Sequence, residues 1–242
     1  MKTKPTKAMQ RRKFLGTTSL AAAGLTLGAG HLFAGPAILR QTGDSASDIR
    51  GVKIGLITYS FRSMPDQSAE AILSYIRDCG ITAVELMGDP AESFAGKPEN
   101  PVDRRTYYTL RRASRNGNLS DAQKAEMAEM QAAMDAYNAE VAEWRSKISM
   151  APFEKLRNMY ADAGISIYAF KPRAFGRDNT DAEINYGMKA ARALGASHVT
   201  LEHPGDDAHT GKLGRMGAKN GVFVAYHGHE QQTPTFWDTA LR

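Results

Sequence analysis

Two histidines and a carboxylate follow a short apolar segment near the end of the printed sequence. The segment, residues 221–226, is typical of a buried strand, and His227, His229 and Glu230 come directly after it. With a side-chain repeat of two, both histidines fall on one face. Such groups suit a divalent metal or proton transfer, and a hydrogen-bonded polar strand end is the alternative. All three are therefore candidate metal ligands, and Glu230 and His227 are also candidate catalytic residues.

The first 37 residues have the pattern of an export signal. Six basic and no acidic residues lie between Met1 and Lys13, and an apolar stretch of small residues runs on to Ala37. This order is typical of a signal peptide, and the Arg11-Arg12 pair resembles the twin-arginine type. Glycines make the stretch weakly apolar for a membrane-spanning helix of ~20 residues. We therefore expect residues 1–37 to be a twin-arginine signal peptide, recognised by the twin-arginine translocase, and the mature protein to be periplasmic.

The signal also accounts for the basic character of the chain. The sequence has 31 Lys and Arg against 26 Asp and Glu, and without the six basic residues of the signal 25 remain against 26. The basicity is thus no evidence for nucleic-acid binding, which we do not expect. Cys79 is the only cysteine of the sequence, so no disulfide can form within it.

After a polar stretch at residues 38–50, which we expect to be a linker, apolar segments alternate with helix signals. One such signal is the capping box of Thr180 and Glu183. Strands that alternate with helices predict a parallel α/β sheet. The expected strands are residues 52–59, 81–87, 165–171, 197–202 and 222–226.

Polar residues gather where these strands end, which is where a (β/α)8 barrel builds its active site. No glycine-rich phosphate fingerprint follows the first strand, which disfavours a dinucleotide-binding sheet. We therefore expect a (β/α)8 TIM barrel, of which residues 51–242 contain about five βα units. Besides His203 and the three residues after the last strand, five residues at these ends are candidate substrate-binding residues: Tyr59, Arg62, Glu85, Lys171 and Glu202.

A long polar insertion, at about residues 91–149, separates the second and third strands. Ser120 and Gln123 have capping-box spacing, and the apolar residues that follow recur every three or four positions. We expect a crossover helix that packs on the barrel; a homodimer seam is the alternative. The apolar stripe consists of Met127, Met130, Met134, Tyr137, Val141, Trp144 and Ile148. Arginines before it, at 104, 105, 111, 112 and 115, are either solvated or line a substrate entrance.

Residues 55–62, 83–86 and 226–230 resemble strand ends of the sugar phosphate isomerase/epimerase family, the xylose-isomerase-like TIM barrels. The resemblance runs from about Gly51 to the C-terminus. It implies a divalent metal (Mn, Mg, Co or Zn) at the rim and proton transfer next to the carbonyl of a small-molecule sugar. The family holds its metal with two Glu, one Asp and one His from strands five to eight. The segment after residue 226 would supply the strand-five ligand, with Glu202 beside it.

Two classes of function stay open at this point. One is an exported, metal-dependent sugar isomerase or epimerase, and the other is a non-catalytic exported sugar-binding barrel without full metal ligation. A keto-glycoside lyase or hydrolase of the same superfamily is a variant of the first. Because the family has eight βα units, we expect a C-terminally truncated chain, inactive by itself, with the remaining ligands beyond Arg242.

Overall fold

The computed structural model describes residues 47–202 and 206–228, which belong to one compact unit, residues 36–242. The expected signal peptide and most of the expected linker lie outside the described residues. Among the described helices, none combines the length and the apolar character that a membrane span requires.

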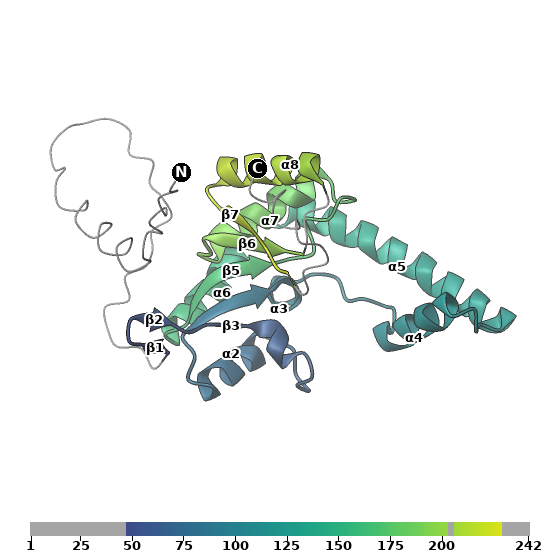
Figure 1. Ribbon diagram of the computed structural model, residues 1–242, viewed down its shortest axis with the longest axis horizontal. Helices are drawn as coiled ribbons and strands as arrows, with labels where there is room; N and C mark the ends of the chain where they lie inside the picture. The colour runs from purple at the N-terminus through teal and green to yellow at the C-terminus, as the bar shows by residue number, and fades with distance from the viewer. Residues whose placement is uncertain (1–46, 203–205, 229–242) are drawn as a thin grey trace, which may run out of the picture. The chain divides into compact units, whose positions relative to one another are not determined.

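Five parallel strands form the central sheet, and each lies next to the strand that follows it in the sequence (Figure 1). A doubly wound sheet would reverse this order at a switch point, whereas the wall of a (β/α) barrel keeps it. The prediction of a parallel α/β fold is therefore confirmed, and the closed eight-stranded barrel stays a prediction. The strands are β3 (Leu56–Ile57), β4 (Ala83–Met87), β5 (Ser166–Lys171), β6 (His198–Leu201) and β7 (Phe223–Tyr226).

Helices connect the strands and pack on one face of the sheet. Val84 and Leu86 of β4 are fully buried among the core residues of these helices. The predicted capping box is confirmed, because the Thr180 hydroxyl accepts from the Glu183 amide and Glu183 binds the Thr180 amide. The connecting helices are α2 (Ala69–Asp78), α3 (Gly88–Phe94), α6 (Ala151–Asp162), α7 (Asp181–Ala193) and α8 (Asp207–Asn220).

The prediction of a single first strand at residues 52–59 is wrong. Arg50 and Gly51 have positive φ angles of 56° and 80°, so the chain turns back there and forms a hairpin with the end of the expected linker. The parallel sheet begins only after this hairpin and is followed by a turn of 3-10 helix. The elements concerned are β1 (Asp48–Ile49), β2 (Val52–Lys53), β3 and η1 (Thr58–Phe61).

The insertion contains two helices besides α3, namely α4 (Arg104–Arg115) and α5 (Asp121–Lys147). Helix α4 packs along α5, where the Tyr107 hydroxyl donates to Gln131. The other end of the apolar stripe packs on the body of the protein, where Trp144 and Ile148 contact the core. The expected packing of α5 on the barrel thus holds for its C-terminal end, while α4 packs against the helix elsewhere. The alternative of a homodimer seam stays untested.

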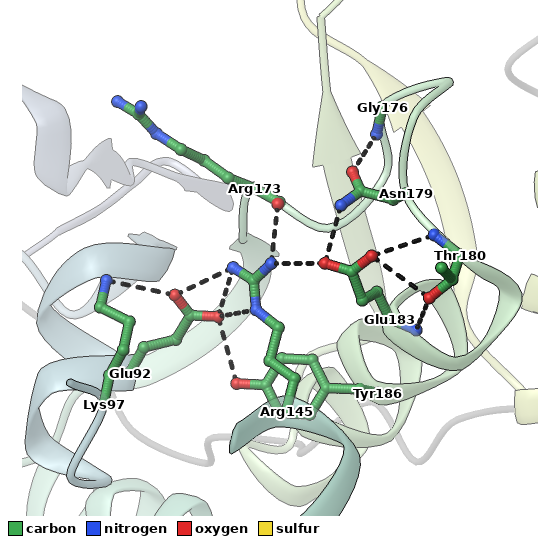
Figure 2. A network of polar contacts seen from close by, with 9 residues as sticks. All are labelled: Glu92, Lys97, Arg145, Arg173, Gly176, Asn179, Thr180, Glu183 and Tyr186. Atoms are coloured by element: carbon green, nitrogen blue, oxygen red, sulfur yellow. Dashed lines mark hydrogen bonds and ion pairs between the residues drawn. The ribbon is translucent and has the colours of Figure 1, made fainter. Parts of the chain in front are cut away.

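One buried arginine of α5 binds carboxylates of α3 and α7 (Figure 2). The Arg145 guanidinium, 6% exposed, donates to both carboxylate oxygens of Glu92 at 3.0 and 3.2 Å and to Glu183 at 3.3 Å. Glu92 also accepts from the Tyr186 hydroxyl at 3.2 Å and from Lys97 at 3.4 Å. Burial and the neighbouring Glu92 charge raise the pKa of Tyr186, so the phenol stays protonated and donates.

Candidate functional site at the carboxyl ends of the strands

A cavity of about 720 Å³ lies at the carboxyl ends of the parallel strands. All five strands contribute a residue at or just beyond their ends: Ile57, Met87, Lys171, Leu201 and His227. In parallel α/β proteins these ends meet at one edge and carry the ligand site. The volume lies within the range of ~300–1,000 Å³ typical of small-molecule sites.

Four of the residues singled out from the sequence line this one cavity. Tyr59 comes from η1, Lys171 from the end of β5, Glu202 from directly after β6, and His227 from directly after β7. Residues up to 168 positions apart in the sequence thus line one cavity, as expected for a site at the strand ends. The assignment of a role to each of them stays a prediction.

Lys171 and Glu202 form an ion pair inside the cavity. The Lys171 ammonium lies 2.7 Å from a Glu202 oxygen, and their side chains are 12% and 54% exposed. Because Glu202 is half-exposed, the pair contributes at most ~1 kcal/mol to stability. A ligand hydroxyl can therefore enter between donor and acceptor at small cost.

Glu85 and Arg62 do not line the cavity in the part of the chain that the structure describes. A Glu85 oxygen accepts from the Thr200 hydroxyl at 2.7 Å, which links β4 to β6 across β5. Arg62 stacks on Tyr59, with its guanidinium carbon 4.7 Å from the ring centroid, and donates to the Tyr59 carbonyl at 3.3 Å. In the structure Glu85 thus forms a hydrogen bond to a residue of β6, and Arg62 stacks on the ring of Tyr59.

Only part of the expected metal centre lies within the described residues. His227 continues the sheet, since its amide donates to the Leu201 carbonyl at 2.7 Å, but His203, His229 and Glu230 lie outside the described residues. Within residues 47–202 and 206–228, no three or more His, Cys, Asp or Glu side chains gather as metal ligands would. Glu202 and His227 share the cavity, but zinc sites use at least three protein ligands. The described residues alone therefore do not make up a site of the zinc type.

Sequence reasoning missed the polar residues that the loop between β5 and α7 and the start of α8 bring to the cavity. Arg173, Arg177 and Asn179 come from the loop, and His209 comes from α8. The His209 ring nitrogen Nε2 lies 2.8 Å from the carbonyl of Phe175, to which it must donate. The signal for these residues was their place directly after a strand end, where rim loops begin.

Helix α4 of the insertion reaches the same rim. Arg104 pairs with Asp89 at 3.5 Å, and a hydrogen bond from Arg104 lowers the pKa of the Tyr108 hydroxyl. Burial opposes this shift, and Arg173 of the cavity wall strengthens it. Two arginines from different segments therefore favour the ionised form of one exposed phenol.

We expect Tyr108 to ionise at lower pH than an ordinary tyrosine. In an ultraviolet titration, the difference between wild type and Tyr108→Phe should show a phenolate step below the usual range. The step should move upward in Arg104→Gln, because the largest cause of the shift is gone. An unchanged step in Arg104→Gln would contradict the contact, and Arg111→Gln, an exposed change on the same helix, is the control.

Comparisons with known proteins add little to this picture. No family model matches the chain, and no curated protein matches it. A solved structure, a sugar phosphate isomerase/epimerase from Parabacteroides distasonis ATCC 8503, is 17% identical over 75% of this chain, with a TM-score of 0.39. This chain spans 57% of the length of that protein. At this TM-score the likeness carries no argument, so the function must be argued from the cavity.

Proposed function

We propose that the full-length protein is an exported sugar isomerase or epimerase that works in the rim cavity. The observation that carries the proposal is the meeting of Tyr59, Lys171, Glu202 and His227 around one cavity of about 720 Å³ at the ends of parallel strands. The resemblance of the strand ends to the sugar phosphate isomerase/epimerase family supports the same function, and we also propose that the sheet belongs to a (β/α)8 barrel.

The chemistry needs a group that moves a proton next to a carbonyl and groups that hold the sugar hydroxyls. His227 fits the first requirement, because an imidazole ring can accept and donate protons and this ring lies directly after β7 in the cavity. Lys171 and Glu202 offer a donor and an acceptor 2.7 Å apart, which suits vicinal hydroxyls or a carbonyl. Tyr59, half-exposed at the mouth, offers a flat face on which a sugar ring can stack.

A non-catalytic sugar-binding barrel is the second candidate. The observation in its favour is that Glu202, which could serve as an acid or base, already pairs with Lys171 at 2.7 Å. The two candidates differ in whether a carbon-bound proton leaves the sugar.

Exchange in heavy water separates them. The full-length protein is incubated with a panel of aldoses and ketoses, free and phosphorylated, and the products are read by mass spectrometry and NMR. Deuterium next to the carbonyl supports the isomerase or epimerase. Saturable binding with neither exchange nor conversion to another sugar overturns it in favour of the binding barrel. Absence of both binding and exchange across the panel would contradict both candidates.

Metal dependence is part of the proposal through His227, His229 and Glu230. A bound divalent ion would polarise the sugar oxygens as a Lewis acid. We expect at least one of His227→Ala, His229→Ala and Glu230→Ala to lose most of the bound metal in elemental analysis, because removing a ligand leaves the site incomplete. His198→Ala is the control, and unchanged metal content in all three variants would move the site elsewhere.

Export is proposed from the Arg11-Arg12 pair, which precedes an apolar stretch in a segment without acidic residues. Changing both to lysine should leave unprocessed precursor in the cytoplasm, because the receptor reads the arginine pair as an address. Cell fractionation and blotting measure the outcome, with Lys2→Arg as the control. Normal periplasmic processing of the double variant would contradict the twin-arginine interpretation.

A further inference from the structure

The loop between β5 and α7, residues 172–180, supplies six of the fourteen residues that line the cavity. Strand ends fix the floor of the site, but a loop without regular structure must be fixed by contacts of its own. The backbone contacts that hold this loop therefore decide where Arg173, Arg177 and Asn179 stand in the cavity.

Several of these contacts lead to the buried cluster around Arg145 (Figure 2). Arg145 donates to the Arg173 carbonyl at 3.1 Å and to Glu183 at 3.3 Å. The same Glu183 oxygen accepts from Asn179 at 3.0 Å, and Asn179 in turn accepts from the Gly176 amide at 2.8 Å. The other Glu183 oxygen accepts from the Thr180 amide at 3.0 Å and closes the capping box of α7.

We propose that Arg145 is a positioning residue for the cavity: from the insertion helix α5 it fixes the β5–α7 loop through the Arg173 carbonyl and through Glu183. Among the described lining residues none comes from α4 or α5, so α5 influences the cavity through contacts such as these. That the loop forms the wall of a ligand site rests on the proposed function, whereas the fixing of the loop by Arg145 does not.

The chemistry of arginine suits this task. Glu92 takes up two donors of the guanidinium fork, which fixes the plane of the group, and the remaining edge points at the loop. A lysine in its place keeps the charge beside Glu92 but offers one compact ammonium, which cannot bind Glu92, Glu183 and the Arg173 carbonyl in the same geometry. An apolar side chain fills the space but leaves both carboxylates without this partner.

The test is amide hydrogen exchange in the full-length protein, read on peptides that contain Gly176, Asn179 and Thr180. Their amides are protected by the contacts described above or, for Asn179, by the Gly176 carbonyl at 3.2 Å. In Arg145→Lys we expect exchange of these peptides to rise by about tenfold or more while peptides of β4 and β5 keep their wild-type rates, since local opening is separable from global unfolding. Arg111→Met, an exposed arginine of the insertion, should leave both unchanged.

A second variant guards against general destabilisation. Asn179→Ala cuts the link from Glu183 to the Gly176 amide without removing a buried charge, and it should raise exchange in the same peptides. If the loop keeps its wild-type rate in Arg145→Lys, or if it changes only together with β4 and β5, Arg145 is merely structural and the proposal is overturned.

Sugar affinity gives a separate readout. If the wild type binds a sugar, Arg145→Lys should weaken binding by about tenfold, as a displaced wall loses contacts worth one hydrogen bond. Unchanged affinity with a loosened loop would overturn the link to the site. If the wild type binds no sugar, the proposed function fails, and the exchange rates still decide whether Arg145 fixes the loop.

Discussion

Replacing Glu92 with alanine should lower the free energy of unfolding by about 3–5 kcal/mol, the cost of leaving a buried charge without its partner. Glu92 is 1% exposed and accepts from Arg145, Tyr186 and Lys97. Without its carboxylate, these buried donors lose the acceptor that they share. Urea unfolding followed by circular dichroism measures the change.

Two controls belong to this measurement. Glu143→Ala removes an exposed carboxylate that pairs with Lys147 on the same helix, and it should cost less than ~1 kcal/mol. Glu92→Leu combined with Arg145→Met removes both charges and should recover much of the loss, because apolar groups of similar size can replace a buried pair. A loss below ~1 kcal/mol in Glu92→Ala would show that the cluster is hydrated and does not tie α5 to the protein.

His227→Ala should reduce exchange of the sugar proton by ~10²–10⁴-fold, the usual contribution of a general acid or base. The side chain lines the cavity directly after β7, and Glu202 lines it directly after the neighbouring strand β6. His198→Ala is the matched control, because His198 lies at the other end of β6, packed 5.3 Å from the Phe223 ring. Equal losses in both variants would point to general damage, and full activity of His227→Ala would exclude the proposed role.

The parts of the fold that local pattern determines were predictable from sequence. The strands after the first, the capping boxes at Thr180 and Ser120, and the end of α8 at Gly221 all follow from apolar runs and cap residues within a few positions. The first strand was mispredicted because the run at residues 52–59 is divided between the second strand of the hairpin, the first strand of the parallel sheet and the start of η1. The partner of the α5 stripe was also hidden, since α4 is rich in arginine and buries chiefly Tyr107 and Leu110.

The site was predictable to the extent that strand ends define it. Tyr59, Lys171, Glu202 and His227 end or follow strands, so their meeting follows from parallel topology. Arg145 could not be recognised, because it lies beside the apolar stripe of its helix and its partners Glu92 and Glu183 are 53 and 38 residues away. A buried ion pair leaves no local pattern in the sequence, and neither does the hydrogen bond of Glu85, whose partner Thr200 is 115 residues away.

The central claim is that the sugar binds at the carboxyl ends of the strands, beside His227. The most direct test is NMR of the full-length protein with isotope-labelled histidine, in which His227→Ala, His209→Ala and His198→Ala assign the three ring signals. Added sugar should shift the signals of His227 and His209, which line the cavity, in a saturable way and leave that of His198 unchanged. A saturable shift of His198 with His227 unmoved would place the ligand elsewhere and contradict the account.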